Sequence, residues 1–280
     1  MSTFKISKSL NNNVLIANDE NDKEVVLIGR GIGFGKKPGE ILQKDQIEKL
    51  FVLKDPEEQR QYKEVLVSID EQTLKTIIKA VEHIRTRVNQ PLNEHIHIGL
   101  TDHLAFAITR MKNGIGISNP FLLETKGLYP KEFEIATEIT ELVNEELAID
   151  LPLGEIGFIA LHIHSAIVDK EVGDMTKNAD LMMKLIQMIE SELRILIDKS
   201  SLDYMRLIRH LQFAIERVLR NETVDEPEKI TELLKLEYPI CYNLAWKLIK
   251  VMQQELKQHV YEAEAVYLTL HLQRIQSKYK

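Results

Sequence analysis

Two stretches of the chain repeat the same eight-residue pattern of histidine, apolar residues and arginine. They are HLAFAITR, which begins at His103, and HLQFAIER, which begins at His210. In each stretch the arginine, Arg110 or Arg217, follows the histidine by seven residues, and helical geometry places such residues on one face. A neutral imidazole nitrogen is a competent nucleophile, and a guanidinium group pairs well with a phosphoryl group. The pattern therefore indicates histidines that could accept and hold a phosphoryl group.

A second histidine follows each stretch at a matched distance. Glu155 precedes His162 by seven residues, and Glu264 precedes His271 by seven residues. Each glutamate also follows the proline of a Tyr-Pro pair by 25 residues. Both histidines lie in strongly apolar segments, where an imidazole needs a polar partner or a place at a cleft. The candidate phosphorylation sites are His103, His162, His210 and His271.

These matched offsets are typical of an internal duplication. From about residue 56, apolar residues recur at helical spacing, beginning with an amphipathic helix over the segment DPEEQRQYKEVLVSIDEQTLKTIIKAVEHIRTRV. We predict two duplicated all-α helical-bundle domains, at residues 65–170 and 175–280, joined by the polar segment 168–180. Duplication copies a structural histidine as readily as a reactive one, so a purely structural role for the histidines stays open.

The competing interpretation of the helical part is a metal-dependent hydrolase, since helical folds with histidine and aspartate clusters often hold divalent metals. Asp102 precedes His103, but the sequence contains no His-Asp pair and no His-Glu-x-x-His motif. His162 and His164 are two residues apart, which puts their rings on divergent faces of a helix. We therefore expect neither a metal ion nor another cofactor.

Near the N-terminus, the segment GRGIGFGKKPGE at residues 29–40 combines glycines with cationic residues and one aromatic. Its spacing does not fit a nucleotide-binding P-loop, because Arg30 stands where a glycine is required and Lys37 stands where serine or threonine is required. Two interpretations remain. The segment is either a backbone surface that approaches the phosphates of a nucleic acid or a solvated β-turn.

The residues around this segment predict a small sheet. The stretches FKISKSL, NVLIA and VVLIGRGIGF are rich in β-branched residues and are separated by polar turns, and we expect four short strands within the first fifty-odd residues. So small a sheet is marginally stable alone. We therefore expect its apolar face to meet a second copy of the chain in a homodimer.

Charge is unevenly distributed along the 280 residues. The chain carries a net charge of −7, yet residues 1–55 hold nine lysines and arginines against eight acidic residues. Any nucleic-acid site therefore belongs at the N-terminus. The single cysteine excludes an internal disulfide framework, and no apolar run reaches the ~20 residues of a membrane span. We expect a cytoplasmic protein that is not inserted in a membrane.

The N-terminal stretch KISKSLNNNVLI…VVLIGRGIGFGKK resembles the co-antiterminator RNA-binding domain of the BglG/SacY/LicT transcriptional antiterminators. The two repeats, including NEHIHIGLTDHLAFA and GEIGFIALHIHSA, resemble the paired PTS regulation domains of that family. The resemblance covers essentially the whole chain. It implies a multidomain α+β fold, with a small antiparallel β RNA-binding domain at residues 1–58 before the two regulation domains. Within the family, IGRGIGFGKK and EYPICYNLAWKLIKVMQQ are most similar to the antiterminator of the glucose phosphotransferase operon.

The resemblance implies a regulator and not an enzyme. In this family a dimeric domain binds a hairpin in the leader mRNA and blocks an overlapping terminator. Histidines of the regulation domains are phosphorylated by the phosphotransferase (PTS) proteins HPr and the sugar-specific enzyme II. On this pattern His103 and His162 are the sites of the first regulation domain, and His210 and His271 are those of the second. The alternative that stays open is the helical hydrolase with an N-terminal dimerisation sheet.

The resemblance also implies an RNA-binding surface. Asparagine and arginine can read base edges, and an aromatic ring can stack on a base splayed from a loop. For Phe34 the competing interpretation is a core aromatic. The residues carried onto the RNA surface are Lys8, Asn11, Asn13, Gly29, Arg30, Gly31 and Phe34.

Overall fold

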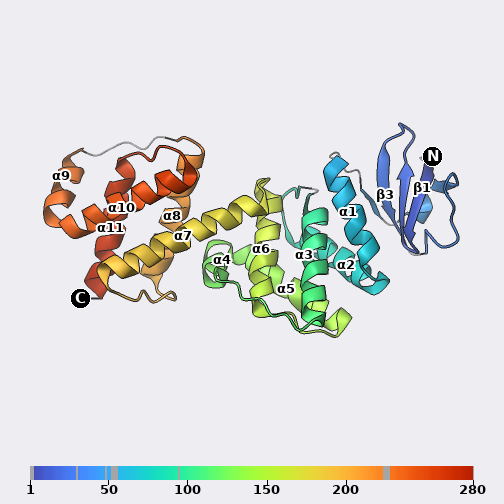
Figure 1. Cartoon of the computed structure of the whole chain (residues 1–280), viewed down its shortest axis with the longest axis horizontal. Coiled ribbons are helices and arrows are strands. Elements are labelled where there is room, and N and C mark those ends of the chain that lie inside the picture. Colours follow the sequence, from blue (N-terminus) through green and yellow to red (C-terminus); the bar gives the residue numbers. More distant parts are fainter. Residues whose placement is uncertain are drawn as a thin grey trace. The chain divides into compact units, whose positions relative to one another are not determined.

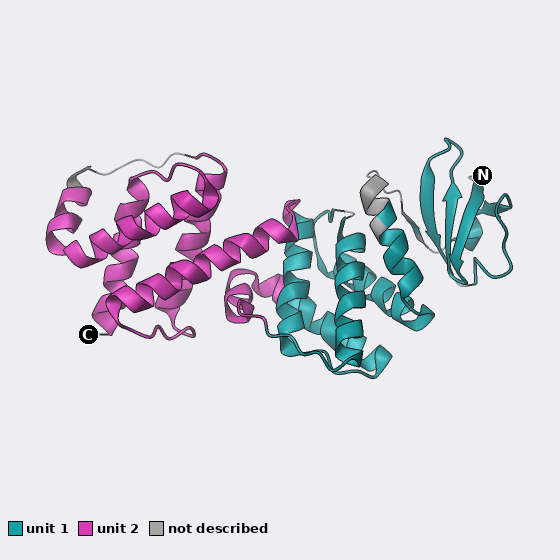
Figure 2. Cartoon of the chain, in the orientation of Figure 1, with its two compact units in different colours: residues 1–118, 134–167 teal, residues 119–133, 168–280 magenta. Residues whose placement is uncertain are grey.

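The computed structural model describes residues 3–29, 31–47, 49–51, 56–93, 95–222 and 228–279. It consists of an N-terminal sheet followed by helices (Figure 1). The chain divides into two compact units (Figure 2). The first unit contains residues 1–118 and 134–167, and the second contains residues 119–133 and 168–280.

The sheet is antiparallel, as the sequence predicts, and within the described residues it has five strands where four were expected. The strand order is β4-β1-β2-β3-β5. The two edge strands are three residues long, too short to show an alternating pattern in the sequence. The strands are β1 (Thr3–Asn11), β2 (Val14–Asn18), β3 (Glu24–Ile28), β4 (Ile41–Gln43) and β5 (Lys49–Phe51), with a single 3-10 turn η1 (Lys44–Gln46) between the last two.

Both apolar faces of this sheet are buried within the chain. On one face Phe4, Leu15 and Leu27 pack with Ile32 from the loop after β3. On the other face Val14, Val26 and Ile28 pack against Tyr62 and Leu66 of helix α1 (Pro56–Ser68). The sequence predicts that an apolar face meets a second copy of the chain, but these contacts already cover both apolar faces. A homodimer therefore needs another surface.

The helices of the first unit follow the predicted helical texture, with one interruption. The segment expected to form one amphipathic helix is broken between α1 and α2 (Glu71–Arg87). The first helix ends at Ser68, and Asp70 caps the second, because its side chain accepts a hydrogen bond from the Thr73 N–H at 2.8 Å. The remaining helices of this unit are α3 (His95–Lys112), most of α5 (Pro130–Leu147) and α6 (Leu153–Val168).

The second unit is a helical bundle around the fully buried Tyr204. The polar segment 168–180, predicted as a linker, is mostly helix, because α7 begins at Val172. Met175 and Ala179 are buried on one face of that helix while the polar residues occupy the other faces, so the polarity marks an exposed surface and not a loop. The helices of this unit are α4 (Leu122–Leu128), α7 (Val172–Leu193), α8 (Leu202–Leu219), α9 (Glu228–Glu237), α10 (Pro239–Leu256) and α11 (Ala263–Lys278).

The short helix α4 belongs with the second unit although it precedes α5 and α6 in the chain. Its buried Glu124 accepts a hydrogen bond from the Tyr204 hydroxyl at 2.5 Å and pairs with Lys199 at 3.2 Å. Phe121, just before the helix, joins the core of the second unit. None of the described helices has the length and apolar character that crossing a membrane requires.

Candidate functional site

The first pair of candidate histidines is brought together by α3 and α6. The ring centroids of His103 and His162 lie 4.9 Å apart, with the ring planes at 39°. Glu155, which is 1% exposed, lies beside them: its Oε1 accepts a hydrogen bond from Arg110 at 2.7 Å. Its Oε2 is 2.9 Å from His103 Nε2, but these two atoms are not hydrogen-bonded to each other. The histidine, glutamate and arginine that share the repeated spacing therefore form one cluster.

Gly99 makes room for the His162 ring on α3. A Cβ atom at Gly99 would lie 3.2 Å from His162 Nδ1, closer than most such contacts. Gly99 stands four residues before His103, on the same face of the helix. The sequence analysis did not single out this glycine. Aligning the two repeats position by position could have found it, because the second repeat has Arg206 there.

The second pair repeats the first in the same antiparallel register. His210 on α8 and His271 on α11 have ring centroids 4.5 Å apart, with the planes at 37°. Arg217 donates two hydrogen bonds to Glu264, at 2.7 and 2.9 Å. His210 Nε2 is 3.7 Å from Glu264 Oε2, and like His103 Nε2 it has no hydrogen-bond partner among the described residues. The duplication therefore preserves the whole cluster and not only its histidines.

Burial lowers the pKa of three of these histidines, His162, His210 and His271, and so favours their neutral form. Desolvation, with a smaller effect from the charge of His103, lowers the pKa of His162 from 6.5 to about 3. Desolvation also lowers the pKa of His210 to about 3, assisted by His271 and Arg217. Burial lowers the pKa of His271 too, and the charges of Arg274 and Arg206 add to that effect. A neutral ring nitrogen keeps the lone pair that attack on phosphorus requires.

These pKa directions predict a pH-dependent stability. The unfolded chain binds protons on these histidines near pH 6.5, whereas the folded chain does so only near pH 3, so stability is lost as pH falls below 6.5. We expect His162→Gln to reduce the slope of unfolding free energy against pH by up to about 1.4 kcal/mol per pH unit. Urea unfolding of the variant and the unmodified chain between pH 5 and 6.5 would measure it. Equal slopes would contradict a neutral, buried His162.

The clusters do not resemble a metal centre. Among the residues that the structure describes, no group of three or more histidine, cysteine, aspartate or glutamate side chains is placed to hold a metal ion. The carboxylates nearest the histidines, Glu155 and Glu264, are bonded to arginine. The chemistry of the two histidine clusters suits a phosphoryl group, because a neutral imidazole can accept such a group and a nearby arginine can stabilise it.

At the N-terminus, the glycine-rich loop lies against the asparagine turn between β1 and β2. Asn13 is buried, and its Oδ1 accepts a hydrogen bond from the Gly31 N–H at 2.7 Å. Its own N–H donates to Asn11 Oδ1 at 2.9 Å, and the Gly29 N–H donates to the Asn13 carbonyl at 3.0 Å. Asn13 therefore supports the loop, with its amide oxygen already used, while Asn11, Gly29 and Gly31 lie around it.

Gly33 is the glycine with the clearest steric requirement. A Cβ atom there would lie 2.2 Å from the Asn11 carbonyl oxygen and 2.9 Å from Ser9 Oγ. Its N–H donates to the Asn12 carbonyl at 2.9 Å, which holds the loop on the turn. In the sequence, Gly33 is one of several glycines in the segment at residues 29–40 and is not distinguished from them. Nothing in its spacing indicated the neighbouring turn.

The other candidate RNA-binding residues fall in different places. Phe34 is 75% exposed at the tip of the loop, so the core-aromatic interpretation is wrong. Lys8 lies on β1 and lines a groove against α1 with Glu64 and Val67, and not the glycine-rich loop. Arg30 lies outside the described residues. The structure therefore gathers Asn11, Asn13, Gly29, Gly31 and Phe34, and leaves Lys8 apart.

Comparison with known proteins shows what this arrangement belongs to. Residues 4–60 match the family of the CAT RNA binding domain, and residues 78–166 and 183–275 match the PRD domain family. The chain belongs to the BglG/SacY/LicT family of transcriptional antiterminators. It is an RNA-binding regulator with a duplicated regulation domain, and not an enzyme, so the helical hydrolase alternative is wrong.

Named relatives span nearly the whole antiterminator. The PtsGHI operon antiterminator of Bacillus subtilis is 51% identical over 99% of this chain and 98% of its own. The GlcA/glcB genes antiterminator of Staphylococcus carnosus is 43% identical over 97% of this chain and 96% of its own. A crystal structure of GlcT CAT-PRDI matches with a TM-score of 0.53 and 52% identity, covering 59% of this chain and 98% of that one. The predicted α+β architecture is confirmed.

Proposed function

We propose that this antiterminator acts as a cytoplasmic homodimer on the leader mRNA of glucose phosphotransferase genes. The names of its relatives support that target, since the Bacillus subtilis protein acts on the PtsGHI operon and is 51% identical. The dimer binds a hairpin through residues 1–58 and prevents formation of the overlapping terminator. The loop tip with Phe34, together with Asn11, Gly29 and Gly31, forms the RNA surface, and Asn13 supports the loop through its hydrogen bond to Gly31. We also assign Arg30, which lies outside the described residues, to RNA binding. Lys8 contributes charge from β1.

HPr and the glucose-specific enzyme II phosphorylate the paired histidines of the two regulation domains, residues 65–170 and 175–280. The observation that carries this proposal is the pair of histidine rings beside an arginine-bound glutamate, repeated in one register in both domains. In each transfer the bond between phosphorus and the donor side chain breaks, and an N–P bond forms at the acceptor ring. The donor side chain leaves with the electron pair of the broken bond, and the acceptor nitrogen supplies its lone pair to the new bond. The acceptor sites are His103, His162, His210 and His271.

Phosphate on the first domain inhibits. A phosphoryl group adds about −1.5 to −2 charge at pH 7 and would lie close to the buried carboxylate of Glu155. Asp102 adds a further negative charge on the same helix. Sugar uptake drains phosphate from enzyme II, so the first domain loses its phosphate and the protein becomes active.

Substitution of the exposed aromatic tests the RNA surface. We expect Phe34→Ala to weaken binding of a leader hairpin by about 5- to 150-fold, because stacking on one base contributes about 1–3 kcal/mol. The matched control is Ile41→Ala, which removes another exposed apolar side chain of the same domain. Gel-shift titration of the full chain would measure both variants, and affinity should fall with salt at a slope of about −0.7 to −0.9 per phosphate contact. Equal affinity of Phe34→Ala and the unmodified chain would remove Phe34 from the interface.

A further inference from the structure

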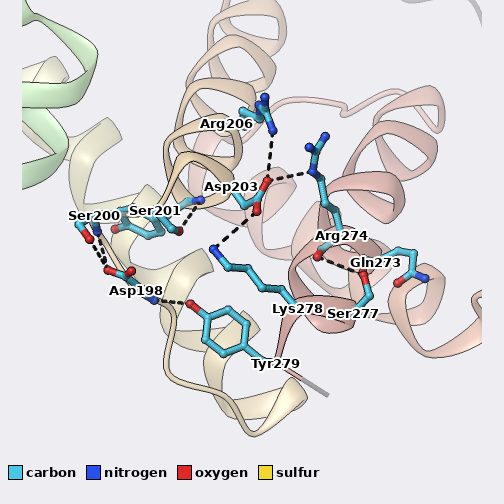
Figure 3. A network of polar contacts seen from close by, with 11 residues as sticks. Asp198, Ser200, Ser201, Asp203, Arg206, Gln273, Arg274, Ser277, Lys278 and Tyr279 are labelled. Atoms are coloured by element: carbon cyan, nitrogen blue, oxygen red, sulfur yellow. Dashed lines mark hydrogen bonds and ion pairs between the residues drawn. The ribbon is translucent and has the colours of Figure 1, made fainter.

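One carboxylate in the second regulation domain gathers three cationic side chains (Figure 3). Asp203 Oδ1 lies 3.3 Å from Arg206 Nη1 and 2.9 Å from Arg274 Nε, and Oδ2 lies 3.8 Å from Lys278 Nζ. Asp203 is only 19% exposed, whereas the three cations are about half exposed. The cluster therefore carries an excess of positive charge on an accessible surface.

This cluster adjoins the second histidine pair. Arg206 stands four residues before His210 on α8, and Arg274 stands three residues after His271 on α11, so each arginine shares a helix face with its histidine. The two rings lie 4.5 Å apart, which brings both arginines to the same end of the pair. The lowered pKa of His271, to which both arginine charges contribute, agrees with that placement.

The first domain lacks these charged residues at the corresponding sequence positions. Counting from its histidines at the same offsets, Gly99 replaces Arg206 and Ser165 replaces Arg274. Ile96 stands where Asp203 does. Arg206 and Arg274 are therefore positions at which the sequences of the two repeats differ. Ion pairs this exposed contribute little to stability, about 0–1 kcal/mol each, so helix packing alone does not explain them.

We propose that Arg206 and Arg274 form an anion clamp for a phosphoryl group on His271, and that Asp203 holds both arginines in place while the histidine is unmodified. The inference rests on the proposed phosphorylation of this domain. A phosphoryl group offers three acceptor oxygens and more negative charge than one carboxylate, so it competes with Asp203 for the two guanidinium groups. His271 keeps its phosphate longer than His103 or His162, because Gly99 and Ser165 stand in the first domain at the positions of Arg206 and Arg274.

Phosphoramidate separates the clamp from recognition of a donor protein, because its own P–N bond breaks, ammonia leaves and the N–P bond forms at the histidine without PTS proteins. We would treat the full chain with phosphoramidate, map phosphohistidine by mass spectrometry and follow its loss with time. We expect the double variant R206Q/R274Q to lower phosphate occupancy of His271 by about tenfold, which corresponds to about 1.4 kcal/mol. Occupancy of His103 and His162 should not change.

Two further variants make the outcome decisive. Lys278→Gln removes a cation from the same carboxylate but two helical turns from His271, and should leave its occupancy unchanged. Asp203→Asn releases the arginines and should raise occupancy. Equal occupancy of His271 in the double variant and the unmodified chain, or phosphate on His210 in its place, would overturn the clamp. Repeating the reaction with phosphorylated HPr in place of phosphoramidate tests the proposed function separately. If HPr transfers no phosphate while phosphorylation of His271 by phosphoramidate still depends on Arg206 and Arg274, the result contradicts the proposed function but supports the anion clamp.

Discussion

Replacement of Gly33 by alanine is expected to lower the affinity of the full chain for its leader hairpin by about 100-fold, a change of about 2.7 kcal/mol in binding free energy. The added Cβ would lie 2.2 Å from a backbone oxygen, that of Asn11, and backbone cannot yield as a flexible side chain does. The loop must therefore move off the asparagine turn. That movement breaks the bond from the Gly33 N–H to Asn12 and pulls Gly31 from Asn13 Oδ1. Phe34, carried on the same loop, is displaced with them.

The matched control is Gly116→Ala, since a Cβ at that loop glycine meets nothing within 4 Å. Circular dichroism and thermal melting would verify that both variants keep the sheet and the helices. Gel-shift titration then compares their affinities for the hairpin. A folded Gly33→Ala chain that binds as tightly as the Gly116→Ala chain would show that the loop does not form the RNA surface.

In the N-terminal domain, the sequence predicts those strands whose residues alone carry a recognisable pattern. The β-branched runs of β2 and β3 predict strands because the apolar residues in them are all buried. The short edge strands carry no such pattern, because their pairing with β1 and β3 defines them. Asn13 illustrates a different limit. Its residue type suits base reading, but a partner 18 residues away along the chain takes its amide oxygen.

The histidine clusters were predictable because duplication repeats spacing. Equal offsets in the two repeats indicated that Arg110, Glu155 and the histidines act together, and the structure places them in one cluster. The offsets could not indicate which faces of α3 and α6 meet. The role of Gly99 depends on that packing, and so does the convergence of Arg206 and Arg274 on Asp203. The sequence did not indicate that most of segment 168–180 is helical, because surface polarity is common to loops and to exposed helix faces.

The difference between the two clusters bears on the direction of control. In both, an arginine is already bound to a buried glutamate, so that arginine is only partly available to a phosphoryl group. The second domain has two further arginines, Arg206 and Arg274, that could bind a phosphoryl group. The first domain has Gly99 and Ser165 at those positions. Added negative charge is therefore less favourable in the first domain. A dimer whose states differ by a few kcal/mol can be shifted by such a penalty.

Replacing His103 and His162 together with alanine is accordingly expected to give antitermination that no longer depends on sugar. The variant lacks both proposed sites of inhibitory phosphorylation, so a reporter gene behind the leader terminator should be expressed equally with and without glucose. The buried glutamate keeps its bond to Arg110, which limits the structural cost of losing the rings. Reporter activity in cells, together with the dimer mass and hairpin affinity of the purified chain, would measure the effect.

The control for this double variant is His83→Ala, because His83 lies on α2, pairs with Glu138 at 2.6 Å and belongs to neither histidine cluster. It should retain sugar-dependent expression. The corresponding double replacement of His210 and His271 removes the second pair and shows whether the two domains act in the same direction. If the His103 and His162 variant is folded and dimeric but silent under both conditions, phosphorylation of the first domain activates. The electrostatic repulsion between the phosphoryl group and Glu155 would then not determine whether phosphorylation activates or inhibits. A contact between protomers would have to determine it.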